Sequence, residues 1–116
     1  MEVIFHIDEP EKWPVLLGNV RNLLQYAQDT QTQWCIEVLA NGGAVTALKA
    51  ENARAGGFYP AMEALAQKQV LFAACRNALR GNSIAENTLC PFVRTVPAGV
   101  AELAEKQRDG YAYIKP

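Results

Sequence analysis

The hydrophobic and polar positions of the chain follow two different periods, which predict strands and helices in turn. Residues 2–7 and 34–39 are short apolar runs, typical of strands that are covered on both faces. The stretch between them begins a helix at Trp13 and Pro14, because proline suits the first helical turn. Its apolar side chains recur at helical spacing: Leu16, Val20, Leu23, Leu24 and Ala27. The pattern therefore opens with a strand, a helix and a second strand.

The rest of the chain continues the alternation of strands and helices. We expect a short helix over residues 44–52, a break at residues 55–57, and a further helix from Pro60 through Gln69. A helical turn is expected over residues 84–89. The last helix is expected to begin at Pro97 and end at Gly110, with an apolar stripe of Val100, Leu103 and Ala104. The remaining strands are predicted at residues 70–74, 91–96 and 111–114. Alternating strands and helices predict a parallel sheet with helices on both faces.

Length and charge narrow the class of protein. A chain of 116 residues suits one compact domain spanning residues 1–116. Eleven basic and twelve acidic residues give a net charge of -1, and no basic run occurs, so we expect no nucleic-acid partner. The opening residues lack the basic and apolar regions of a signal peptide, and no stretch approaches membrane-spanning length. The sequence therefore predicts a cytoplasmic protein without a membrane partner.

Three cysteines, Cys35, Cys75 and Cys90, form no CxxC pair, and His6 is the only histidine. We therefore expect no metal site and no metal or organic cofactor. The odd number of cysteines favours free thiols. Cys35 lies inside a predicted strand and is expected to fill the core. Cys90 precedes Pro91 in a less regular stretch and is a candidate for an exposed thiol.

The segment VLFAACRNALRG, residues 70–81, carries the most distinctive chemistry of the chain. Cys75 directly follows a predicted buried strand and precedes a short helix that Gly81 ends. A thiol at this junction lies against the free N–H groups and the positive end of the helix dipole. Arg76 and Arg80 add positive charge, and together these features favour the nucleophilic thiolate. The same pattern also fits a buried cysteine that acts as a small hydrophobic residue.

Polar residues follow three of the predicted strands. Asp8 follows the first strand, Asn41 with Gly42 and Gly43 follows the second, and Cys75 follows the third. Because ligands bind beyond the carboxyl ends of strands in open α/β sheets, we expect these groups to share one edge. The glycine turn has backbone N–H groups that can hold a small anionic sulfur species. His6, near the end of the first strand, is a candidate acceptor for the Cys75 proton.

Several phrases, in order along nearly the whole chain, match a known family: VIFHIDEPEKW, NVRNLL, IEVLANGGAV, FAACRNAL and VPAGVAELAEKQRDGYAYIKP. The chain resembles the DsrE/DsrF-like family of sulfur relay and sulfur oxidation proteins. The resemblance implies a three-layer α/β/α fold with a five-stranded, mainly parallel sheet, and assembly into trimers or hexamers. It also implies that Cys75 accepts sulfane sulfur as a persulfide and passes it to a partner protein's cysteine.

Two classes of function follow from these observations. The first is a sulfur carrier or sulfurtransferase-like protein acting through Cys75, with a sulfur donor and an acceptor protein as partners. Its supporting or binding residues would be His6, Asp8, Asn41, Gly42, Gly43, Arg76 and Asn77. The second is an oligomeric binding or scaffold module in which Cys75 is structural. A weaker alternative is a thiol redox sensor that pairs Cys75 with Cys90. A cysteine hydrolase, which would need Cys75 and His6 in contact with Asn41 or Asp8, ranks below sulfur transfer.

Overall fold

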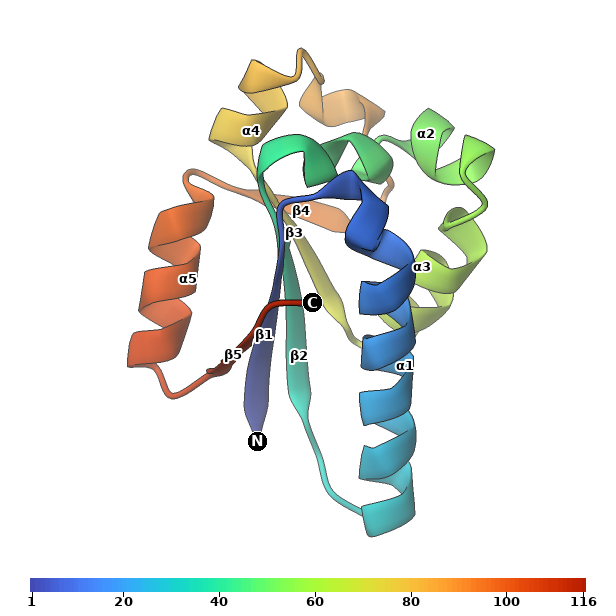
Figure 1. The fold of residues 1–116 in the computed structure, drawn as a ribbon, viewed down its shortest axis with the longest axis vertical. Helices are drawn as coiled ribbons and strands as arrows, with labels where there is room; N and C mark the ends of the chain where they lie inside the picture. The colour runs from blue at the N-terminus through green and yellow to red at the C-terminus, as the bar shows by residue number, and fades with distance from the viewer.

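The computed structural model describes residues 1–116 and has a five-stranded sheet between two layers of helices (Figure 1). The strands are β1 (Glu2–Ile7), β2 (Cys35–Ala40), β3 (Leu71–Cys75), β4 (Val93–Val96) and β5 (Ala112–Ile114). They lie in the order β4-β3-β2-β1-β5, and every neighbouring pair is parallel. The predicted α/β/α fold with a five-stranded parallel sheet is therefore confirmed.

The connections divide the helices unequally between the two faces. The helices are α1 (Trp13–Thr30), α2 (Ala50–Ala55), α3 (Tyr59–Gln67), α4 (Arg76–Gly81) and α5 (Gly99–Arg108), with the 3-10 helices η1 (Pro10–Lys12), η2 (Gly42–Leu48) and η3 (Glu86–Thr88). From β1 to β4 the chain crosses the sheet in one direction, so right-handed crossovers keep α1 and α3 on one face. The return from β4 to β5 places α5 alone on the other face (Figure 1). No helix is both long and apolar enough to cross a membrane.

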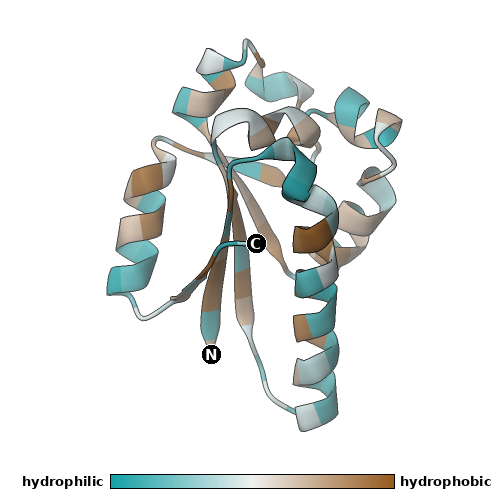
Figure 2. Cartoon of the chain, viewed as in Figure 1, coloured by the Kyte–Doolittle hydropathy of each residue, from teal (hydrophilic) through white to brown (hydrophobic).

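The buried residues form two hydrophobic clusters, one on each face of the sheet, because successive side chains of a strand point to opposite faces. Val3, Phe5 and Ile7 of β1 belong to the larger cluster, which α1 and α3 cover. Ile4 belongs to the smaller cluster, which contains five buried residues and lies under α5: Ile4, Leu39, Ala73, Val96 and Leu103. Hydrophobic colour concentrates on the strands in Figure 2, while the helices mix both kinds of residue. The face under α5 is therefore held by far less apolar packing than the other face.

Three sequence predictions need correction. Residues 44–52 are not one helix, because η2 occupies residues 42–48 and α2 begins only at Ala50. Tertiary contacts fix this segment instead, since the Trp13 indole donates to the carbonyl oxygen of Ala44 over 3.0 Å. The strand expected over 91–96 begins at Val93, because Pro91 lacks the N–H that a ladder needs.

The third correction concerns α5. This helix begins at Gly99, and of the predicted stripe only Leu103 is buried, whereas Ala104 is exposed and Val100 is 71% exposed. A single helix across a sheet touches it along a narrow line, so most of its apolar side chains stay in solvent. The spacing of apolar residues in α5 therefore predicts that the segment is helical, but it does not predict which of these residues are buried.

Candidate functional site

The carboxyl edge of the sheet brings together the residues that follow β1, β2 and β3. Gly42 has φ +53° and lies so close to the end of β1 that a Cβ atom there would be 3.2 Å from the carbonyl oxygen of Asp8. The N–H of Ala44 donates to that same oxygen over 3.2 Å. On the other side, the Asn82 amide donates to the carbonyl oxygen of Gly42 over 3.2 Å. The glycine turn is thus fixed between β1 and the end of α4.

Cys75 is the last residue of β3 and the N-cap of α4, with extended backbone at φ -70° and ψ 121°. Its side chain lies on the face that α5 covers, where it contacts the first turn of that helix. A Cβ atom added to Gly99 would lie 3.2 Å from Cys75 Cβ and 3.3 Å from Asn41 Cβ. Cys75 and Asn41 therefore flank the same point of α5. The helix covers the thiol so well that Cys75 is only 6% exposed.

A chain of hydrogen bonds runs from Asn41 through His6 to β5. His6 Nε2 lies 2.9 Å from Asn41 Oδ1, and His6 Nδ1 lies 2.6 Å from the Tyr113 hydroxyl. An amide oxygen only accepts, so Nε2 carries the proton and Nδ1 accepts from Tyr113. Both ring nitrogens are therefore engaged in hydrogen bonds, which hold the ring between Asn41 and Tyr113. The role of His6 as an acceptor for the Cys75 proton stays a prediction.

Asp8 is occupied by an ion pair with the penultimate residue of the chain. Lys115 Nζ lies 2.9 Å from Asp8 Oδ1. This hydrogen bond lowers the pKa of the Asp8 carboxyl and raises the pKa of Lys115. The ion pair joins the segment after β5 to the segment after β1, and it forms one side of the site.

The two cations of α4 are engaged with other side chains. Arg76 Nε donates to Glu86 Oε2 over 3.0 Å, and the pair is exposed. Arg80 donates to the side-chain oxygen of Asn77, one turn earlier in α4. Arg76 and Asn77 thus lie beside Cys75 in sequence, but their side chains hold α4 together and tie it to η3.

Glu37 is a residue of this face that sequence reasoning missed. Its carboxyl group lies on β2 beneath α5, is 2% exposed, and has no hydrogen-bond partner on either oxygen. Lys106 Nζ of α5 lies 3.6 Å from Glu37 Oε1 and 3.9 Å from Glu102 Oε2, while Arg94 approaches Glu102 to 4.0 Å. Burial, and then the neighbouring Glu102, raise the pKa of Glu37 to about 8. Glu37 is the only charged residue in the apolar run 34–39, and this pattern could have indicated a buried carboxyl group.

Tyr113 and Gly99 were missed for different reasons. Tyr113 meets His6 across 107 positions of sequence, because β5 pairs with β1 at the sheet edge, and no local pattern encodes that contact. Gly99 had a weak signal, since small residues at a helix start permit close approach to a sheet. Tyr113 bonds to His6, which in turn bonds to Asn41. Gly99 lets the first turn of α5 lie close to Asn41 and Cys75.

The other two cysteines differ from their predicted environments. Cys35 is exposed, because it is the first residue of β2, so its assignment as core filler was wrong. Cys90 is 1% exposed within the larger cluster, where burial raises the pKa of its thiol, so it is not the exposed thiol considered above. Cys75 instead faces α5. The two thiols thus pack against different neighbours, Cys90 in the larger cluster and Cys75 against Gly99, and both are free, which gives no support to the redox-sensor alternative.

Replacing Gly99 by alanine is expected to lower stability by about 1–3 kcal/mol, the usual effect of overpacking. The added methyl group would meet Leu39 Cδ1 at 3.1 Å as well as Cys75 and Asn41, so the first turn of α5 must move. We also expect faster alkylation of Cys75, measured by iodoacetamide labelling and peptide mapping beside urea unfolding. Gly18→Ala is the matched control, since nothing lies within 4 Å of its Cβ position. Equal behaviour of the two variants would contradict this packing.

Comparisons with known proteins agree with the geometry of the fold. The sequence model described as the DsrE/DsrF-like family matches residues 23–116. The solved structure of MTH1491 from Methanobacterium thermoautotrophicum, a protein of unknown function, is 32% identical with a TM-score of 0.85, covering 99% of this chain and 98% of that one. BT1422 from Bacteroides thetaiotaomicron, a conserved protein of unknown function, is 14% identical with a TM-score of 0.70, covering 99% and 94%, and shares the fold. A comparison with curated proteins gives no match.

Proposed function

Because the chain belongs to the DsrE/DsrF-like family, we propose that it is a sulfur carrier that holds sulfane sulfur on Cys75 as a persulfide. The observation that carries the proposal is the position of Cys75 at the carboxyl edge of a parallel sheet, where α/β folds bind their ligands. Asn41 and the glycine turn lie at this same edge. Cys75 is also the residue at which β3 ends and α4 begins, so the first N–H groups of α4 have no helical acceptor.

The chemistry needs no cofactor. The Cys75 thiolate attacks the outer sulfur of a donor persulfide; a new S–S bond forms at Cys75, the S–S bond of the donor breaks, and the electron pair leaves with the donor thiolate. In the second step an acceptor thiolate attacks the outer sulfur on Cys75. The Cys75–sulfur bond breaks and Cys75 returns as a thiolate, so the cycle has no net oxidation.

Access to the thiol requires movement of α5. Cys75 is 6% exposed, and the turn that covers it is the first turn of the only helix on that face. That helix is held by its own Leu103 packed with the four other residues of the smaller cluster and by the ion pairs of Lys106 with Glu37 and Glu102. Val100, beside Gly99 in this turn, is exposed and available to a partner. Assembly into trimers or hexamers and a cytoplasmic location remain part of this proposal.

The test is sulfur release by cyanide, which takes the outer sulfur of a persulfide as thiocyanate. The reduced protein is incubated with polysulfide, freed of donor, and treated with cyanide either directly or after exposure to an acceptor thiol that is then removed together with the sulfur it has taken. We expect close to one thiocyanate per chain before the acceptor and none after it. The assay also uses Cys35→Ser, because the exposed Cys35 can be loaded independently. No release above background, or release that depends wholly on Cys35, would overturn the proposal.

The burial of Cys75 favours a second candidate, a binding module in which this cysteine is structural. In that case the thiol acts as a small apolar side chain packed against Gly99. Cys75→Ala would then lower stability, and in proteins that also carry Cys35→Ser neither the alanine variant nor the chain with Cys75 would load sulfur. The cyanide assay and an unfolding curve on the same samples separate the two functions.

A further inference from the structure

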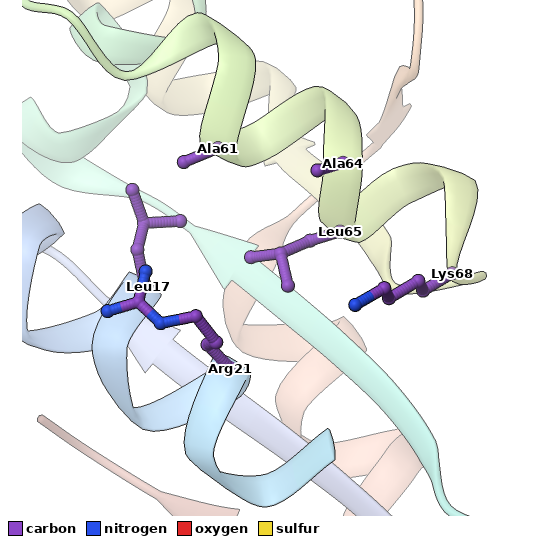
Figure 3. Close-up of a pocket in the computed structure, with 6 residues that line it drawn as sticks. All are labelled: Leu17, Arg21, Ala61, Ala64, Leu65 and Lys68. Atoms are coloured by element: carbon purple, nitrogen blue, oxygen red, sulfur yellow. The ribbon is translucent and has the colours of Figure 1, made fainter. Parts of the chain in front are cut away.

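A small pocket lies between α1 and α3 (Figure 3). These two helices cover the face of the sheet opposite α5 (Figure 1). Its volume is about 120 Å³, and its walls come from the two helices and the residue after α3: Leu17, Arg21, Ala61, Ala64, Leu65 and Lys68. Leu17 and Leu65 are buried and form its apolar base, while Ala61 and Ala64 present only methyl groups. The small side chains of α3 thus leave a hollow beside α1.

The charges around this pocket are all of one sign. Arg21 and Lys68 line it, and no acidic residue does. Both cationic side chains are exposed, and neither forms an ion pair or a side-chain hydrogen bond. Arg21 is the only basic residue of α1. In Figure 3 the Arg21 side chain lies beside Leu17 on α1, and the Lys68 side chain points toward Leu65 from just beyond α3, so the two cations stand on opposite sides of Leu65.

We propose that this pocket binds a small organic monocarboxylate, with its carboxylate between Arg21 and Lys68 and its apolar body against Leu17 and Leu65. A guanidinium and an ammonium group can each donate to the carboxylate, and arginine does so through two parallel bonds. The volume is somewhat smaller than a cavity that holds benzene, so the apolar body has about six non-hydrogen atoms or fewer. A peptide segment is too large for this space. The ligand is therefore a free short-chain or aromatic acid, and its site is independent of Cys75.

Benzoate titration followed by NMR tests this site in the complete protein. We expect saturable shifts of the methyl signals of Leu17 and Leu65, and none with benzamide, which has the same shape without the charge. Hexanoate in the same titration distinguishes an aliphatic ligand from an aromatic one. Ala64→Leu fills the pocket with a good helix former, so it is expected to abolish the shifts while the protein remains folded.

Substitution of the cations tests the charge argument. Arg21→Gln is expected to weaken benzoate binding about threefold, and Arg21→Gln with Lys68→Gln about tenfold, in line with exposed ion pairs. Arg108→Gln removes one charge outside the pocket and is expected to leave binding unchanged. Three results would overturn the proposal: no saturable shift with either acid, equal binding of benzamide, or binding that Ala64→Leu does not reduce. Binding of an acidic peptide without binding of benzoate would do the same.

Discussion

Replacing Cys75 by serine is expected to remove all cyanide-releasable sulfur at this position and leave the fold intact. A hydroxyl group cannot accept sulfane sulfur, so the loss should be complete. The fold should persist because Cys75 is the N-cap of α4, a position at which serine is among the preferred residues. The side chain of serine also fits the space beneath Gly99. Thiocyanate yield and the urea unfolding curve are the two measurements.

Cys35→Ser is the matched control, because it removes an exposed thiol at the opposite end of the sheet. That variant is expected to keep the sulfur held on Cys75. If Cys75→Ser is folded and still yields thiocyanate in a protein that also lacks Cys35, the assignment of Cys75 fails. If Cys75→Ser does not fold, Cys75→Ala and the alkylation rate of the natural chain decide between carrier and structural cysteine.

Replacing Glu37 by glutamine is expected to remove most of the pH dependence of stability between pH 4.5 and about 8. The folded protein raises the pKa of Glu37 from its usual 4.5 to about 8, so the native state holds the proton more tightly than the unfolded state. The free energy of unfolding contributed by this group is therefore greatest below pH 4.5 and falls as pH rises through the window. Above about pH 8 both states are ionised, and the contribution is constant.

Each unit of difference in pKa corresponds to about 1.4 kcal/mol, so the loss across this window amounts to a few kcal/mol. Glutamine matches the neutral carboxyl in shape, and it keeps Lys106 and Arg94 paired with Glu102 alone. We expect the variant to exceed the natural chain in stability at pH 8 and to equal it near pH 4. Urea unfolding across this range measures the effect, with the exposed Glu105→Gln as control. Parallel curves for the natural chain and Glu37→Gln would contradict the buried, proton-holding state of Glu37.

The sequence alone predicted the architecture well because two periods of hydrophobicity separate strands from helices. It also predicted that Asp8, Asn41 and Cys75 share an edge, since parallel strands end on the same side. It did not predict the hydrogen-bond partners of the two His6 ring nitrogens. One partner, Tyr113, lies near the other end of the chain and reaches His6 because β5 pairs with β1. A local pattern describes an element but not what packs on it, and this applies also to the exposed stripe of α5.

The cysteines illustrate the same limit. Cys35 is next to Ile36 in an apolar run, yet it is exposed because the strand begins there. Cys90 lies in an irregular stretch, yet it is buried because the loop folds over the larger cluster, with its N–H donating to Leu48 over 2.9 Å. Burial depends on the ends of elements and on long-range contacts, which hydrophobic periodicity does not contain.

The most direct measurement is the location of the added sulfur in the natural protein. The reduced chain is incubated with a persulfide donor, the persulfide is trapped by alkylation, and the intact mass and the mass of each cysteine peptide are determined. We expect one additional sulfur atom on the peptide containing Cys75, removed by reduction. Sulfur on Cys35 alone, or no added sulfur with Cys75 also slow to alkylate, would contradict it.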